Sequence, residues 1–109
     1  MSFNVLTIPP FDRQLKRLAK KYPSLKIEFA ELIKSLEEDP EQSTKLGNNC
    51  YKIRIAIASK GKGKSGGGRV ITNFVIAEGT VYLISIYDKS EQENLSDKEL
   101  AELLKHIPQ

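Results

Sequence analysis

The chain has 109 residues, of which 39% are hydrophobic and 28% are charged, and its formal net charge is +3. A chain of this length and composition forms one globular domain, residues 1–109, with a single core and no room for a second. It contains no apolar run of membrane-spanning length, and its single cysteine, Cys50, excludes an internal disulfide framework and suits a reducing cytoplasm. One cysteine and one histidine are too few for a four-ligand structural zinc site.

The N-terminal part is predicted to form a short strand followed by two helices. Residues 3–8 (FNVLTI) are the strand, which Pro9 and Pro10 end. Apolar residues at helical spacing then predict one helix that ends at Pro23 and a second that Ser24 caps and Pro40 bounds. The apolar stripe is Phe11, Leu15, Leu18 and Tyr22 in the first helix, and Leu25, Phe29, Leu32, Ile33 and Leu36 in the second.

The middle of the chain is predicted to be a run of strands. Residues 39–49 are polar and are expected to connect the second helix to a strand over residues 50–58, in which β-branched residues alternate with polar or small ones. A Lys/Gly loop over residues 59–68 has no apolar side chain. Two more strands follow at residues 69–76 and 80–88, and their short link predicts an antiparallel meander.

The last helix has the clearest local signal. Ser96-Asp97-Lys98-Glu99 fits a capping box, and Leu95 and Leu100 are placed to form a hydrophobic staple. The predicted fold is therefore α+β with the order β-α-α-β-β-β-α. An antiparallel sheet has the αα-hairpin on its apolar face, and a C-terminal helix completes the chain. The stripe of that last helix is Leu100, Leu103, Leu104 and Ile107.

Positive charge is concentrated in residues 45–72, which contain seven cations and no acid. The remainder of the chain has ten cations against fourteen acids, so an acidic body carries one strongly basic segment. Such a cluster repels itself without a counter-charge, and it therefore predicts a polyanionic partner. The seven cations are Lys45, Lys52, Arg54, Lys60, Lys62, Lys64 and Arg69.

Three of these cations are candidates for one phosphate site. Lys52 and Arg54 project from the same face of the predicted strand, one pleat apart. If the next strand pairs with this one, Arg69 lies near them, and the three side chains can clamp a phosphate and stabilise charge in a transition state. The alternative is that outward charges on strands only keep an exposed face soluble.

The Lys/Gly loop admits more than one interpretation. Residues 58–65 (ASKGKGKS) fit a loose phosphate-loop pattern, but that pattern requires a helix immediately afterwards, and three glycines and a strand follow here. A flexible solvated hairpin loop is the simplest alternative. We favour a mobile cationic loop that closes over a nucleic-acid backbone, with Lys60, Lys62 and Lys64 as its RNA-binding residues.

Histidine and tyrosine give weaker signals. His106 lies next to the C-terminus with no partner pattern, so a surface position is expected rather than acid–base chemistry. Tyr51, Tyr82 and Tyr87 are able to stack on bases, but Tyr51 falls on the apolar side of its strand. Tyr82 and Tyr87 have opposite parity, which predicts that at most one of them faces the cationic side.

Three segments, together with the order of elements, carry a family resemblance. They are residues 50–54 (CYKIR), 61–71 (GKGKSGGGRVI) and 82–91 (YLISIYDKSE). With these segments the chain resembles the RelE/ParE toxin superfamily, in the HigB-like branch of type II toxin–antitoxin systems. The resemblance implies a ribosome-dependent mRNA interferase, which is an endoribonuclease that inhibits translation in the cytoplasm without a metal or other cofactor.

The resemblance also implies roles for individual residues. Basic side chains promote attack of a ribose 2′-hydroxyl on the adjacent phosphate, which leaves a cyclic phosphate and a 5′-hydroxyl end. Lys52, Arg54, Arg69 and Lys89 match the catalytic positions, with Arg69 as the transition-state clamp. RelE-like members have a tyrosine near the position of Leu95, so the general base is unassigned here and Tyr87 is a possible substitute.

The implied partners are a cognate antitoxin, the ribosome and mRNA, with no membrane and no small-molecule cofactor. Two other functions are compatible with the same features. One is a ParE-like inhibitor of DNA gyrase, because the same fold serves both activities. The other is a non-catalytic RNA-binding module, which would bind RNA in a salt-dependent way without cutting it.

Overall fold

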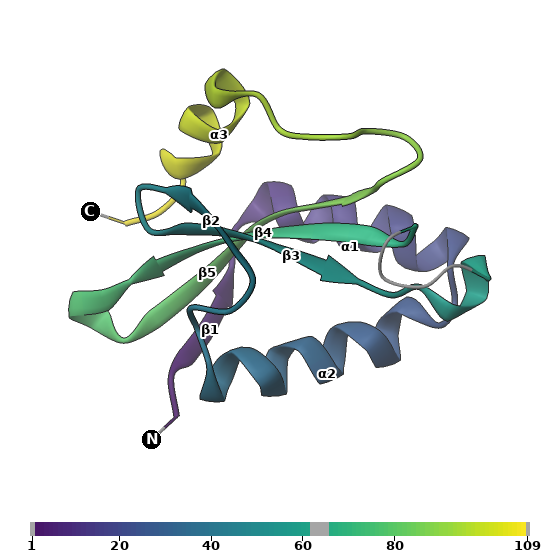
Figure 1. Ribbon diagram of the computed structural model, residues 1–109, viewed down its shortest axis with the longest axis horizontal. Helices are drawn as coiled ribbons and strands as arrows, with labels where there is room; N and C mark the ends of the chain where they lie inside the picture. The colour runs from purple at the N-terminus through teal and green to yellow at the C-terminus, as the bar shows by residue number, and fades with distance from the viewer. Residues whose placement is uncertain (1, 62–65, 109) are drawn as a thin grey trace.

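The computed structural model describes residues 2–61 and 66–108, and it confirms the predicted α+β fold (Figure 1). Two short 3-10 turns, Ala58–Lys60 and Ile76–Glu78, add to three helices and five strands. In chain order these are β1 (Asn4–Thr7), α1 (Pro9–Lys21), α2 (Leu25–Glu38), β2 (Thr44–Gly47), β3 (Cys50–Ile55), β4 (Gly68–Val75), β5 (Thr80–Asp88) and α3 (Asp97–Leu104). Among the described residues no helix is long and apolar enough to cross a membrane.

All five strands form one sheet in the order β1-β5-β4-β3-β2. The predicted antiparallel meander of β3, β4 and β5 is confirmed. The first strand, β1, completes the sheet by pairing in parallel with β5. This arrangement makes the sheet mixed rather than wholly antiparallel, with β5, β4 and β3 in its interior.

The edge strand β2 was not predicted, because residues 39–49 had been interpreted as a polar connection. All four of its residues are exposed, so it has no buried face and no alternating pattern to reveal it. Backbone pairing with β3 holds it in place. The missed signal was the pair Asn48 and Asn49, whose positive φ angles of 52° and 62° fit a two-residue hairpin turn.

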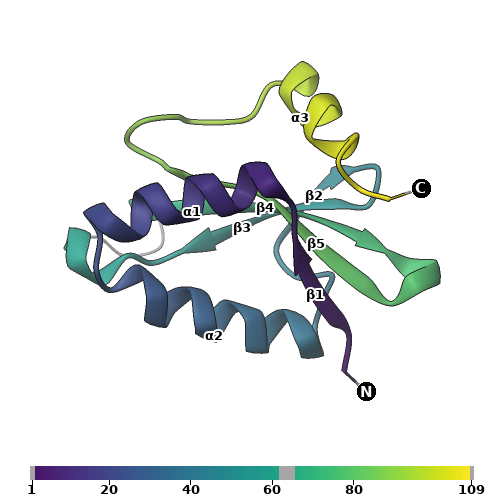
Figure 2. The ribbon, with the colours of Figure 1, turned by 180° about the vertical axis from the view of Figure 1, so that it is seen from behind.

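The helices lie on both sides of the sheet. Figures 1 and 2 show α3 across the sheet from α2, while α1 runs alongside β5. Side chains from α1 and α2 fill the core on the hairpin side, and those buried most deeply are Phe11, Leu18, Leu25 and Leu36. Thus the αα-hairpin covers the apolar face, as predicted, and the opposite face is partly covered by α3.

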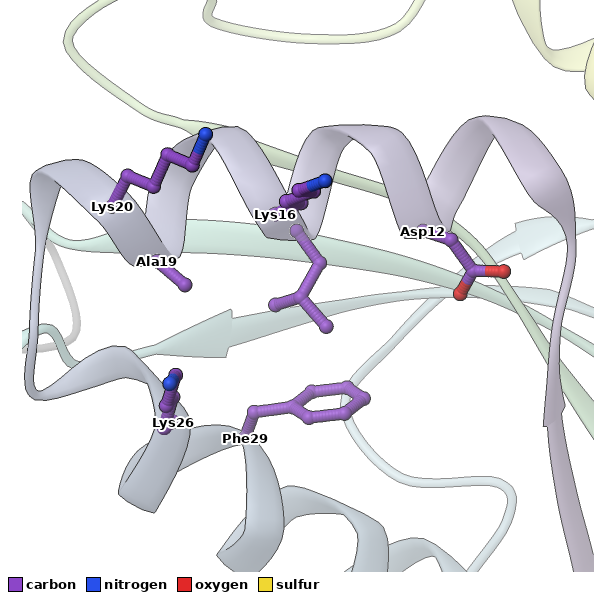
Figure 3. Close-up of a pocket in the computed structure, with 7 residues that line it drawn as sticks. Asp12, Lys16, Ala19, Lys20, Lys26 and Phe29 are labelled. Carbon is purple, nitrogen blue, oxygen red and sulfur yellow. The ribbon is translucent and has the colours of Figure 1, made fainter.

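Part of the predicted helical stripes is not fully buried. Leu15, Phe29 and Ile33 pack against the core but remain half-buried. The cause is the divergence of α1 and α2 away from their joint, which Figure 2 shows. A groove of about 540 Å³ remains between them, and Ala19 and Phe29 point into it in Figure 3.

The predicted caps have different outcomes. The capping box of α3 is confirmed: the Glu99 amide donates to Ser96 Oγ at 3.1 Å, and the Ser96 amide donates to Glu99 Oε1 at 3.2 Å. Ser24 occupies the position before α2, but its side chain makes no capping bond there. Its hydroxyl accepts instead from the Ser59 amide at 2.9 Å, so it ties the helical joint to the turn after β3.

The divergence of α1 and α2 predicts that two leucines of the same helix contribute unequally to stability. Leu18 is fully buried, so Leu18→Ala is expected to lower the free energy of unfolding by about 3 kcal/mol through lost contacts and a cavity. Leu15→Ala, at the half-buried groove, is expected to cost only about 1 kcal/mol. Chemical denaturation measures both, and equal losses would contradict the packing described here.

Candidate nucleic-acid interface

Strand pairing brings the predicted cations together on one face of the sheet. Arg54 of β3 lies directly opposite Arg69 of β4, and Arg69 lies opposite Tyr87 of β5. Residues that face each other in this way share one side of a sheet, and Lys52 shares that side because it is two residues from Arg54. The row crosses the three central strands on the side away from the αα-hairpin.

Lys52, Arg54 and Arg69 line a pocket of about 360 Å³, named here the cationic pocket. The segment that follows β5 forms its other wall, and Figure 1 shows this segment arching from the end of β5 to α3. Lys89 comes from this segment, so all four residues that were predicted to be catalytic lie around one cavity. Its lining is Thr44, Lys52, Arg54, Arg69, Lys89, Glu93 and Asn94.

The four cations differ in exposure and support. Arg69 is only 5% exposed, and its Nη1 donates to the carbonyl of Gly68 at 2.9 Å. Arg54 and Lys89 are exposed, whereas Lys52 is half-buried and donates from Nζ to Asn94 Oδ1 at 3.1 Å. A buried, oriented guanidinium beside more exposed cations is suited to holding a phosphate in one geometry.

Sequence reasoning missed the pocket's polar residues, Thr44, Glu93 and Asn94. Thr44 belongs to the unpredicted strand β2, and the other two lie in a segment that was interpreted as a polar link. No local pattern distinguishes them, because their role depends on the path of the segment over the sheet. Glu93 is an acidic residue in the lining of this pocket, although the basic segment over residues 45–72 contains no acid.

Lys60, predicted to bind RNA, is held inside the fold instead. Its Nζ forms an ion pair with Asp88 Oδ1 at 2.5 Å, and the two side chains are 10% and 0% exposed. The same ammonium group donates to the carbonyl of Gly66 at 2.9 Å and lies 5.9 Å from the centre of the Tyr22 ring. We therefore reassign Lys60 to a structural role, while Lys62 and Lys64 lie outside the described residues.

Asp88 is the centre of this buried network. Besides Lys60, it accepts hydrogen bonds from the Tyr22 hydroxyl at 2.6 Å and from the amide and hydroxyl of Ser90 at 2.9 and 2.7 Å. Burial alone would raise the pKa of Asp88, but these hydrogen bonds outweigh it and hold the pKa well below its ordinary value. The carboxylate is thus charged and fully used within the fold.

The network fixes the two edges of the Lys/Gly loop beside the cationic pocket. Lys60 lies near the start of the loop and Gly66 near its end, and the Lys60 ammonium group contacts both the Gly66 carbonyl and the Asp88 carboxylate. The amide of Lys89 donates to the carbonyl of Gly67 at 3.1 Å. Asp88 therefore fixes the end of β5, and with it the position of Lys89 relative to Arg69.

The phosphate-loop interpretation is wrong. Among the described residues, Gly66 and Gly67 lead directly into β4, and no helix begins there to complete a phosphate cradle. Glycine is required at position 67 for a steric reason, because a Cβ atom there would collide with the carbonyl oxygen of Ile55. The glycines allow the loop to return closely against β3.

The parity argument for the tyrosines is also wrong. Ile71 pairs with Ser85 and Thr72 pairs with Leu83, so β5 contains one extra residue, Ile84, in a β-bulge. The bulge puts Tyr82 and Tyr87 on the same face, although their numbers have opposite parity.

The three tyrosines are buried, whereas the histidine is exposed. Tyr82 is 6% exposed and donates to Glu78 at 3.3 Å, while Tyr51 belongs to the core, as expected. Tyr87 is 4% exposed, and its hydroxyl is buried without a hydrogen-bond partner among the residues that the structure describes. Burial raises the pKa of Tyr87, so this group keeps its proton at neutral pH. His106 is exposed, in agreement with a surface role.

Comparison with protein families defines the class of protein. Residues 11–107 match the model of the RelE toxin of the RelE/RelB toxin–antitoxin system. The chain therefore belongs to the RelE toxin family. The same comparison does not separate branches of the family, so the HigB-like assignment stays a prediction.

Solved structures confirm the fold. The chain is similar to an arginine-to-alanine double mutant of E. coli toxin RelE in the free state, with 19% identity, coverage of 99% and 100% of the two chains and a TM-score of 0.64. The same mutant in complex with a peptide of antitoxin RelB is 18% identical, with coverage of 99% and 100% of the two chains and a TM-score of 0.58. The toxin–antitoxin complex RelBE2 from Mycobacterium tuberculosis is 15% identical, with coverage of 81% and 92% and a TM-score of 0.56.

The Asp88 network predicts a pH-dependent contribution to stability. Replacing Asp88 by Asn removes one partner of a buried ion pair, so Asp88→Asn is expected to lower the free energy of unfolding at pH 7 by about 3 kcal/mol. The folded pKa of Asp88 is depressed, so its contribution is complete above the unfolded value of about 3.9 and is lost as pH falls below it.

Urea denaturation at pH 6 and pH 3 tests this sign directly. The difference between the natural protein and Asp88→Asn is expected to shrink by about 1 kcal/mol over this interval. Asp39→Asn, at an exposed position, is the matched control and should change stability by less than about 0.5 kcal/mol. A difference that stays constant between the two pH values would show that the Asp88 carboxylate does not carry the effect.

Proposed function

We propose that this chain is the toxin of a type II toxin–antitoxin system, and that it is a ribosome-dependent endoribonuclease that cuts mRNA and inhibits translation. The observation that supports this most is the convergence of Lys52, Arg54, Arg69 and Lys89 on one pocket. These residues come from two paired strands and from the segment after a third, so the fold itself assembles the charge. The ligand with matching charge and shape is a single-stranded RNA backbone.

In this proposal the two arginines bind the scissile phosphate. Arg69 is buried and oriented by its neighbour's carbonyl, so it is already in place before the substrate arrives. Donors fixed in this way stabilise charge that develops on phosphate oxygens without a cost of reorganisation. Arg54, exposed on the adjacent strand, completes the clamp from the solvent side.

The reaction is an internal transfer. The ribose 2′-oxygen attacks the neighbouring phosphorus, loses its proton and forms a cyclic phosphate, while the 5′-oxygen of the next nucleotide leaves and gains a proton. Lys52 and Lys89 lie on opposite walls of the pocket. We propose that one of them accepts the proton from the 2′-oxygen and that the other donates a proton to the leaving 5′-oxygen. Tyr87 is not assigned a part in proton transfer, because it is not among the residues that line the cationic pocket.

Partners follow from the same assignment. The mycobacterial relative and one E. coli structure are complexes with an antitoxin or an antitoxin peptide. We propose that this chain likewise has a cognate antitoxin, which neutralises it by covering the cationic pocket or by blocking entry to the ribosome. The ribosome and mRNA place the activity in the cytoplasm.

Arg69→Ala is expected to reduce the rate of mRNA cleavage on translating ribosomes by about 10²- to 10³-fold, the usual loss when one fixed transition-state donor is removed. The rate is measured at saturating ribosome concentration by mapping new 5′-hydroxyl ends. Arg13→Ala is the matched control, since Arg13 is exposed on α1 away from the pocket, and it should cleave within about threefold of the natural rate.

Arg69→Ala cleavage at the natural rate would remove the clamp from the mechanism. Two other results would assign another function. Inhibition of gyrase supercoiling by the purified protein, with intact message on ribosomes, would favour the ParE-like activity. Salt-dependent RNA binding with no cleavage on translating ribosomes would reduce the protein to an RNA-binding module.

A further inference from the structure

A second, smaller pocket adjoins the cationic pocket and is not used by the proposed chemistry. It has a volume of about 100 Å³ and lies between the sheet and the start of α3. Lys52 and Asn94 line both cavities, so the hydrogen bond of 3.1 Å between them stands at the boundary of the two. Tyr87 lines the smaller cavity, which we name the Tyr87 pocket.

The Tyr87 hydroxyl is the unexplained group in this region. Tyr87 is 4% exposed, and its hydroxyl has no partner among the described residues, although most buried polar groups in a folded protein are hydrogen-bonded. Other hydroxyls of buried tyrosines in the chain are satisfied, Tyr22 by Asp88 and Tyr82 by Glu78. A buried donor beside a cavity is suited to a ligand that enters that cavity.

The walls of the pocket decide which ligand fits. Leu46 and Ile71 from the sheet and Leu95 and Leu100 from the α3 region supply aliphatic surface. Among the residues that line the cavity, Asp97 offsets the charge of Lys52 and the others are neutral, so the lining has no net positive charge with which to bind a phosphate. Apolar walls with a few polar groups at the edge are how proteins hold an unstacked nucleobase.

The size admits the edge of a ring rather than a whole base. A cavity of about 150 Å³ accommodates benzene, whereas this cavity of about 100 Å³ is smaller and adjoins the cationic pocket, where the sugar of a base would lie. We propose that the Tyr87 pocket receives the edge of one base of the RNA strand whose neighbouring phosphate lies in the cationic pocket, and that the Tyr87 hydroxyl reads that edge. This inference rests on the proposed ribonuclease function, and it makes Tyr87 a specificity-determining residue.

Tyr87→Phe tests this, because it removes only the hydroxyl. Cleavage is measured on ribosomes whose mRNA carries each of the four bases in turn at each position of the exposed codon. At one position the natural protein should discriminate among bases, and Tyr87→Phe should reduce that discrimination by roughly fivefold, the effect of one neutral hydrogen bond. Tyr82→Phe, which removes a hydroxyl bonded to Glu78, is the matched control and should leave the profile unchanged.

A second pair of variants keeps the test decisive if Tyr87→Phe folds poorly. Leu46→Phe narrows the Tyr87 pocket from the edge strand, where Leu46 is 41% exposed, and should shift the preference at the same codon position. Leu6→Phe, at a 49% exposed position on the other edge strand, should not.

The outcomes separate the two proposals. A natural protein that cleaves no message would refute the ribonuclease function itself. A natural protein that cleaves, with base profiles unchanged in Tyr87→Phe and Leu46→Phe, would overturn only the base pocket. A uniform loss of cleavage for all four bases in Tyr87→Phe would also overturn it, because the hydroxyl would then serve the chemistry rather than the choice of base.

Discussion

The register of β3 against β4 is the constraint on which the rest of the structure depends. It places Arg54 directly opposite Arg69, and like charges in that position repel one another. The fold tolerates this because the two strands belong to the centre of a continuous sheet, whose backbone pairing and buried hairpin face fix the register independently of the arginines. In the proposed function a phosphate lies between the two guanidinium groups and reduces this repulsion, so the stability of the sheet would hold both arginines in place for the substrate.

Asp88 holds the segments at the end of the sheet in place. It neutralises Lys60 and thereby anchors both edges of the Lys/Gly loop, the end of α1 and the start of the segment that closes the cationic pocket. One cation of the basic segment is thus used within the fold, whereas Lys52, Arg54 and Arg69 line the cationic pocket. This division could not be read from net charge, which treats the seven cations as equivalent.

Local patterns were sufficient for most of the fold and for the convergence of the cations. Alternation in β3 identified which face carries Lys52 and Arg54, and the capping box identified the start of α3. The failures have different causes. The missed strand β2 had a local signal in the Asn48-Asn49 turn that joins it to β3, whereas the bulge at Ile84 shows only in the pairing of β5 with β4. The Lys60–Asp88 pair joins residues that only the return of the loop brings together.

We propose above all that Arg54 and Arg69 hold the scissile phosphate of mRNA on the sheet face opposite the αα-hairpin. The decisive measurement is a cryo-EM structure of the protein on a ribosome, with an mRNA made uncleavable by a 2′-deoxy sugar at the cleavage site. We expect the phosphate next to that sugar to lie within hydrogen-bond distance of both guanidinium groups. An mRNA backbone that passes outside the cationic pocket, or a protein bound through its α1 and α2 side with the pocket facing solvent, would contradict it.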